Sequence, residues 1–136
     1  MARKTDREHL MKMVYQMEMQ NDFSMDACEH YIMNVMGSRP EDPYFLTLSG
    51  YILDHLETID TRINEFSRNW KTSRMAKVDL AILRVAAAEI MYMEDISSAV
   101  AANEAVEMAK RFSTEKSSGF INGVLGGIAG SYENEG

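Results

Sequence analysis

Cationic and aromatic side chains near the C-terminus are the residues of this 136-residue chain best suited to binding a ligand. Phe120 follows closely after Lys110, Arg111 and Lys116. Aromatic faces beside basic side chains suit unstacked RNA bases, because stacking on an aromatic ring contributes ~1–3 kcal/mol per base. The pattern indicates phosphate and base binding, although a phenylalanine standing alone at such a position is more typical of a core residue.

The charge of the chain is unevenly distributed. Its 21 acidic and 14 basic residues give a net charge of −7, which by itself counts against a nucleic-acid partner. Residues 1–16, 62–77 and 110–116 nevertheless carry net charges of +2, +4 and +2, so the remaining residues carry −15. Local patches, and not the net charge, set the field that a phosphate backbone meets. The sequence allows a basic face on an acidic body, while charge alone favours solvated helix faces and loops.

The residue types that bind metals or catalyse reactions show no productive spacing. His9, His30 and His55 form no HxxxH pattern, and Cys28 has only His30 nearby. No glutamate is followed by a histidine three residues later, so the Glu-x-x-His pairs of di-iron bundles are missing. The sequence predicts no catalytic residue, no cofactor and no metal site. A single cysteine cannot form an internal disulfide, which indicates a reducing cytoplasm.

Helices position these side chains nearly throughout the chain. Apolar residues recur at three- and four-residue steps, as on amphipathic helices, and no stretch alternates like a strand. Ser24 is a candidate N-cap, Ser97 or Ser98 is another, and Gly37 suits a helix end. No run reaches the ~18 apolar residues of a membrane span. The helices are expected at about residues 6–19, 24–37, 44–67, 77–93, 98–112 and 114–132.

The predicted fold class is all-α, with about six or seven helices packed as two small bundles. Residues 69–75 lose the helical period and mark a boundary. The N-terminal subdomain is expected at about 1–67 and the C-terminal one at about 76–133. Residues 81–88 are apolar on several sides, which predicts a helix buried between others.

Glycines recur on the last predicted helix. Gly119, Gly123 and Gly127 stand four residues apart and follow no strand, so they do not resemble a phosphate-binding loop. Residues four apart share one helix face. The spacing predicts close packing against a neighbouring helix.

One basic residue stands in the most apolar helix. Arg84 lies there, while Glu104 lies on a helix rich in alanine and valine. A buried charge is costly unless it is paired. We expect Arg84 to meet Glu104, Glu89 or a helix-end carbonyl, as a structural clamp between helices.

Several segments of the chain resemble the NusB family of bacterial transcription antitermination factors. The strongest signal is the combination Asn103-Glu104-Ala105 with Phe120-Ile121-Asn122-Gly123-Val124-Leu125. The resemblance covers essentially the whole chain, and residues 18–60 add little beyond length and helicity. The other matching segments are residues 78–90, residues 103–112, Arg3-Lys4-x-x-Arg7-Glu8, Val14-Tyr15-Gln16 and Asn69-Trp70.

The resemblance implies two packed helical subdomains and no catalytic activity. Family members bind the boxA element of ribosomal RNA leader transcripts together with NusE, a small-subunit ribosomal protein. They act with other antitermination factors in an assembly on RNA polymerase. The RNA-contacting residues that it implies are Arg3, Lys4, Arg7, Phe120 and Asn122, and the NusE-facing residues are Asp79 and Tyr15.

The sequence departs from the family pattern near Phe120. Gly119 stands where a lysine is common, and Gly126-Gly127 replace a usual Asp-Lys pair. Lys116 can supply compensating charge for RNA binding on the same loop. We expect weak RNA affinity without NusE. The alternatives are a protein-binding helical adaptor without RNA contact and an accessory RNA-binding domain like those of some RNA methyltransferases. A homodimer is also compatible with the sequence.

Overall fold

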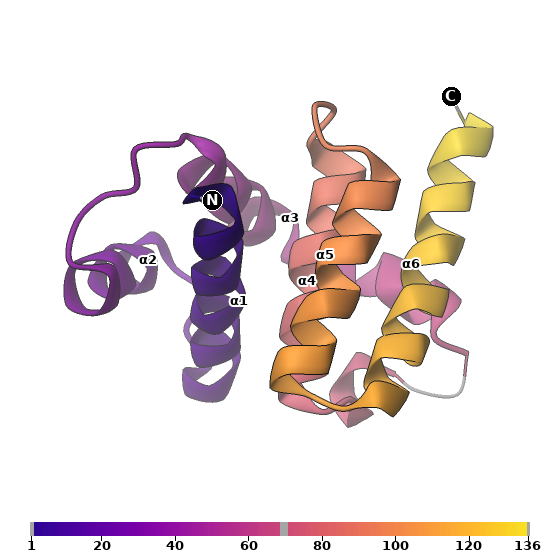
Figure 1. The fold of residues 1–136 in the computed structure, drawn as a ribbon. Helices are drawn as coiled ribbons and strands as arrows, with labels where there is room; N and C mark the ends of the chain where they lie inside the picture. The colour runs from indigo at the N-terminus through magenta and orange to yellow at the C-terminus, as the bar shows by residue number, and fades with distance from the viewer. Residues whose placement is uncertain (1, 69–70, 136) are drawn as a thin grey trace.

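The computed structural model describes residues 2–68 and 71–135, and these form an all-α fold (Figure 1). Asn69 and Trp70, which carry part of the family resemblance, lie outside the described residues. No strand occurs among the residues described, so the predicted fold class is confirmed. The helices are α1 (Ala2–Gln20), α2 (Met25–Tyr31), α3 (Tyr44–Phe66), α4 (Lys77–Tyr92), α5 (Ser98–Phe112) and α6 (Glu115–Glu135), with a π-helical turn η1 (Ile32–Met36) and a 3-10 turn η2 (Thr72–Arg74).

Local capping chemistry explains where several helices begin and end. The Ser24 hydroxyl accepts the Ala27 N–H at 3.1 Å, and the Ser97 hydroxyl accepts the Val100 N–H at 3.2 Å. Both satisfy backbone donors that have no partner within a helix. Gly37 ends η1 with φ of 85°, a left-handed conformation that glycine adopts without a Cβ clash. The predicted N-cap at Ser24 and helix end at Gly37 are confirmed, and of the two serines offered for the α5 N-cap it is Ser97.

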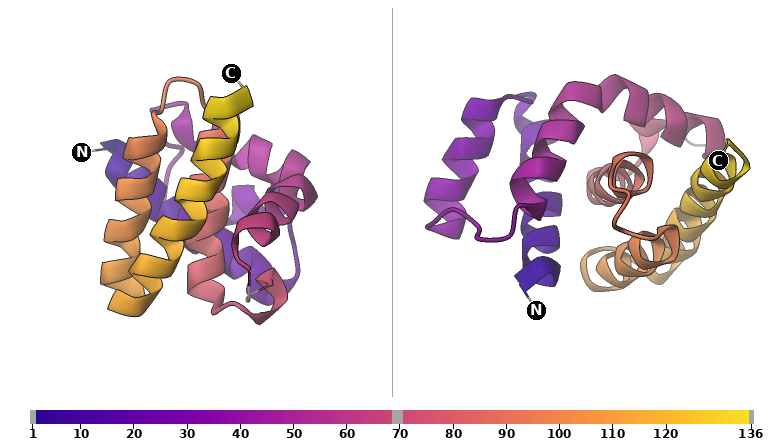
Figure 2. Two further views of the ribbon diagram at one scale, coloured as in Figure 1. Left: turned by 90° about the vertical axis from the view of Figure 1, so that its right-hand side faces the viewer. Right: turned by 90° about the horizontal axis from the view of Figure 1, so that it is seen from above.

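Helix α4 is the centre of the core. Every residue from 79 to 89 is buried, and the helix packs against α1, α3, α5 and α6. The view from above shows α4 enclosed by its neighbours, while α2 lies at the periphery beyond α1 (Figure 2). The apolar character of this segment on several sides correctly predicted its burial.

Helix α3 bridges the N-terminal and C-terminal helices. The sequence predicted an unbroken helix, but His55 has non-helical dihedral angles (φ −126°, ψ 24°) that bend it. The His55 ring stacks on Tyr92 with 4.6 Å between centroids. Residues on both sides of the bend, Leu48 and Ile63 among them, are fully buried. The bend therefore lets one helix arch over the core from α1 to α6 (Figure 2).

Close packing explains only one of the glycines on α6. A Cβ on Gly127 would lie 2.4 Å from Cδ1 and 2.8 Å from Cγ of Phe66 on α3. A Cβ on Gly119 or Gly123 would meet nothing within 4 Å, and both residues are exposed. The prediction of close packing is correct for Gly127 and wrong for the other two.

Neighbouring glycines on α6 give a matched pair of predictions. Gly127→Ala forces Phe66 to move, and overpacking of this kind costs roughly 1–3 kcal/mol, outweighing the ~1 kcal/mol that alanine gains in helix propensity. The Cβ added by Gly126→Ala meets nothing within 4 Å, so this variant gains the helix propensity of alanine without a packing cost. Chemical denaturation should show a lower unfolding free energy for the first variant and a higher one for the second. If both variants were stabilised equally, the close approach of Gly127 to Phe66 would be contradicted.

Candidate nucleic-acid interface

Arg7, expected to contact RNA, is buried inside the protein. Its side chain is 6% exposed, and Nε donates to both carboxylate oxygens of Glu89, at 3.0 and 2.9 Å. Glu89 also accepts the Tyr44 hydroxyl at 3.1 Å. Burial works against the charged form of Arg7, but the hydrogen bond and charge of Glu89 outweigh it and raise the Arg7 pKa. This placement speaks against a phosphate contact and makes Arg7 a link between α1 and α4.

Arg3 is partly exposed and also paired. Its guanidinium lies 3.2 Å from the Asp42 carboxylate and 3.7 Å from that of Asp95, and 5.1 Å from the centroid of the Tyr44 ring. The hydrogen bond to Asp42 raises the Arg3 pKa. Lys4 is exposed and has no carboxylate within 4.0 Å among the described residues. Of the three N-terminal cations, Lys4 alone presents an unpaired charge to solvent in the described structure.

Phe120 lies between two open hollows at the start of α6. One hollow has a volume of about 290 Å³, and its lining includes Arg74, Lys116 and Phe120. The other has a volume of about 370 Å³, and its lining includes Arg68 and Phe120. The ring is half-buried, so it packs partly on the core and partly lines both hollows. The remaining lining residues are Met75, Ala76, Asp79, Thr114 and Ser117 in the first hollow and Phe66, Ser67, Gly119, Gly123 and Val124 in the second.

The cations around Phe120 are exposed. Arg68, Arg74 and Lys116 have no carboxylate within 4.0 Å in the described part of the chain. The structure therefore brings Lys116 and Phe120 together, as expected. No motif predicted a role for Arg68 or Arg74, although the +4 charge of residues 62–77 was a signal for them.

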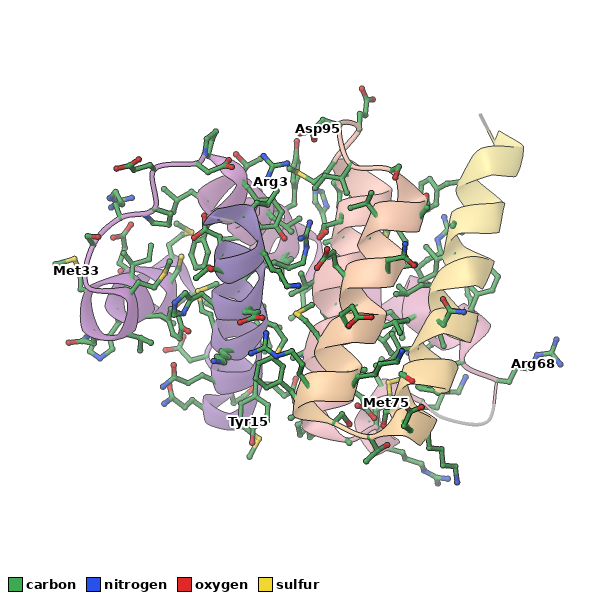
Figure 3. All side chains as sticks on the ribbon, viewed as in Figure 1. Arg3, Tyr15, Met33, Arg68, Met75 and Asp95 are labelled. Carbon is green, nitrogen blue, oxygen red and sulfur yellow. The ribbon has the colours of Figure 1, made fainter. Side chains whose placement is uncertain are left out.

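The two expected groups of RNA-contacting residues do not lie together. Arg3 lies beside Asp95 at the upper end of the molecule, while Met75, which lines the first hollow, lies at the lower end (Figure 3). Helix α6 begins at that lower end (Figure 1). The cationic surface of Phe120 is thus separate from the N-terminal arginines.

Asn122 is exposed but lies on a different face from Phe120. Residues two apart on a helix do not face the same side, and Asn122 lines neither hollow. Its adjacency to Phe120 in sequence does not become adjacency in space.

Asp79, expected to face NusE, is held within the protein. It is 8% exposed, and its two carboxylate oxygens accept the hydroxyls of Ser113 at 2.7 Å and Ser117 at 2.8 Å. These bonds fix the α5–α6 connection through Ser113 and the first turn of α6, where Lys116 also lies, through Ser117. Tyr15 is half-buried near the lower end of α1 (Figure 3). Through its hydrogen bonds to Ser113 and Ser117, the Asp79 carboxylate holds in place the segment that precedes Phe120.

The clamp expected between Arg84 and Glu104 has different partners. Arg84 donates to Asp60 at 2.8 and 2.7 Å and to Glu18 at 2.6 Å. Glu104 lies instead 4.0 Å from Arg7. Arg84 and Glu89 are five residues apart, about 140° around the helix, so they face different neighbours. The clamp therefore joins α4 to α3 and α1, and the predicted pairing with Glu104 is wrong.

Metal-binding clusters and membrane-spanning helices are both absent from the described residues. Within residues 2–68 and 71–135, no three His, Cys, Asp or Glu side chains gather in a way that could hold a metal ion. No helix in that part of the chain is long and apolar enough to cross a membrane.

The structure is that of a small all-α protein whose open cationic surface surrounds the ring of Phe120. The model of the NusB family matches residues 4–130. The chain belongs to the NusB family.

Curated relatives match over nearly their whole length. The transcription antitermination protein NusB of Alkaliphilus oremlandii is 40% identical over 126 residues, covering 93% of this chain and 91% of the relative. The protein of the same name from Bacillus subtilis is 39% identical over 133 residues, covering 98% of each.

Solved structures share the fold. NusB of T. maritima has a TM-score of 0.83 and 29% identity, covering 94% of this chain and 90% of that one. A structure of the antitermination factors NusB and NusE in complex with double-stranded RNA has a TM-score of 0.84, covering 96% of this chain and 98% of the matched chain. At 22% identity, the second comparison shows the fold alone.

Proposed function

We propose that this chain is a transcription antitermination factor that binds boxA-type single-stranded RNA of ribosomal RNA leader transcripts together with NusE. It acts in the cytoplasm within an RNA polymerase antitermination complex and performs no catalysis. The observation that carries the proposal is the half-buried Phe120 among exposed cations that have no described carboxylate partner. The curated relatives, which carry the name transcription antitermination protein NusB, support the assignment to antitermination.

The proposal assigns different roles to the two ends of the molecule. Phe120 stacks on a base and Lys116 binds a phosphate, because both are accessible at the start of α6. Lys4 adds charge at the N-terminal end, where Arg3 and Arg7 are paired internally. Tyr15 belongs to the NusE-facing surface, and the acidic remainder of the chain suits a basic ribosomal protein.

The proposed organisation of the chain has two helical subdomains, at about 1–67 and 76–133. Helix α3 packs on both α1 and α6 and joins them. Arg84 adds a second link, since it pairs with Asp60 on α3 and Glu18 on α1.

Phe120→Leu tests the proposed stacking. Leucine retains most of the apolar contact with the core but has no ring, so the variant should lose the ~1–3 kcal/mol of one stacked base, roughly a 5- to 150-fold weaker Kd. The measurement is binding to a labelled boxA oligonucleotide, with and without NusE, in rising salt. Phe23→Leu is the matched control, since Phe23 is also half-buried and lies in neither hollow.

The same titration decides between the proposal and its alternative. NusE should strengthen binding, and a scrambled oligonucleotide should bind more weakly than boxA. No enhancement by NusE together with equal affinity for the scrambled sequence would refute the proposal. If the chain bound NusE but no boxA RNA by itself, and Phe120→Leu did not change RNA binding by the complex with NusE, the chain would be a protein-binding adaptor instead.

A further inference from the structure

Arg68 and Arg74 are exposed cations beside Phe120 to which neither a motif nor the family resemblance gives a role. Arg68 follows the end of α3, where the backbone turns with φ of 40°. Its side chain points away from the helices into solvent (Figure 3). Arg74 is the last residue of η2, just before α4. Both residues are exposed, and they approach Phe120 from a different part of the chain than Lys116 does.

The two arginines line different hollows that share the Phe120 ring. Phe120 lines both hollows, whereas Arg68 lines only the second and Arg74 only the first. The second hollow stays open at Gly119 and Gly123, where an added Cβ would meet nothing within 4 Å. A single-stranded RNA could stack one base on the Phe120 ring and place the phosphates before and after that base in the two hollows, where each would meet one arginine.

We propose that Arg68 and Arg74 bind backbone phosphates of single-stranded RNA on either side of the nucleotide that stacks on Phe120. The strand then crosses the ring from one hollow to the other. This inference rests on the proposed function and assigns it a second phosphate-binding element. Arg3 and Arg7 would have to break ion pairs before contacting a phosphate, while Arg68 and Arg74 have no described ion pair to break. The arginines near Phe120 therefore supply charge that the N-terminal pair does not offer.

The salt dependence of binding tests the phosphate contacts directly. On single-stranded RNA, each neutralised phosphate contributes about −0.7 to the slope of log K against log salt concentration. Arg68→Gln and Arg74→Gln should each make the slope shallower by about 0.7, and the double variant by about twice that. The probe is a boxA oligonucleotide titrated in the presence of NusE. Arg39→Gln is the control, because Arg39 is exposed, pairs with Glu29 and lies in neither hollow.

Filling the second hollow tests the path of the strand without changing any charge. Gly123→Leu should weaken RNA binding at least fivefold and leave the salt slope contributed by Arg74 in place. Gly130→Leu is the matched control, since a Cβ there also meets nothing within 4 Å. It lies on the same face of α6, about 10 Å farther along.

The results of these experiments distinguish failure of the arginine–phosphate contacts from failure of the proposed function. If the unmodified chain binds boxA no better than a scrambled oligonucleotide, with or without NusE, the proposed function fails and the inference with it. If Phe120→Leu weakens binding but both arginine variants keep the original slope, the inference is wrong and the function stands. An equal slope change in Arg39→Gln would show a general effect of charge and would also overturn the inference.

Discussion

Arg7→Ala is expected to lower the free energy of unfolding by about 3–5 kcal/mol, because it leaves Glu89 as an uncompensated buried charge. Glu89 is fully buried, and the two hydrogen bonds from Arg7 are its main compensation, with a third from Tyr44. A loss of this size is a large fraction of the stability of an ordinary domain. Urea denaturation followed by circular dichroism measures it.

A double variant distinguishes the buried pair from any role in RNA binding. Arg7→Met with Glu89→Leu replaces the pair by apolar side chains, which is often neutral or stabilising for a buried ion pair. Stability should therefore largely return. If the double variant also keeps wild-type affinity for boxA RNA, Arg7 acts through the fold alone. A stable Arg7→Ala protein that has lost only RNA affinity would contradict this assignment.

Local features of the sequence were enough to predict the helices. The apolar period, the Ser24 cap and the Gly37 end are each determined by a few neighbouring residues, so they can be read without knowing the tertiary structure. The burial of α4 also follows locally, since residues 81–88 are apolar on several sides. The bend at His55 does not, because it accompanies a stack on Tyr92, which lies 37 positions later in the chain.

The ion-pair partners of the charged residues could not be predicted from local sequence. Arg7 and Glu89 are 82 residues apart, and Arg84 and Glu18 are 66 apart. Which carboxylate an arginine meets depends on how helices cross, and several acidic residues satisfy the requirement that a buried charge be paired. The need of Arg84 for a partner was therefore predictable, but the groups expected to meet it, Glu104, Glu89 or a helix-end carbonyl, are not its partners in the structure. For the same reason, the sequence does not predict that Arg3 and Arg7 form ion pairs. Nor does it predict that Arg68 and Arg74 form none with the described residues.

Arg84→Met should lower the free energy of unfolding by about 3 kcal/mol at pH 7, since it leaves partly buried Asp60 without its cation and Glu18 with only Lys77, 3.6 Å away. Arg84 is 4% exposed and holds Asp60 and Glu18 at 2.6–2.8 Å. Burial alone would raise the pKa of Glu18, but the hydrogen bond and charge of Arg84 outweigh burial and lower it. A carboxyl whose pKa is lower in the folded state stabilises the protein above its unfolded-state pKa, and this stabilisation disappears as the pH falls through the folded-state pKa.

The destabilisation caused by Arg84→Met should consequently shrink as the pH falls from 7 towards 3, because the folded state of the wild type then loses its charged Glu18. Without Arg84, Glu18 loses the main group that holds its pKa down and keeps only Lys77, 3.6 Å away, so less stability is lost in the variant when that carboxyl is protonated. Urea denaturation at several pH values measures the difference. Arg39→Met provides the contrast, since its exposed pair with Glu29 should contribute at most ~1 kcal/mol. A difference between wild type and Arg84→Met that stays constant across this range would mean that Arg84 stabilises the helices through packing, including its contact with the Phe23 ring, and not through its charge.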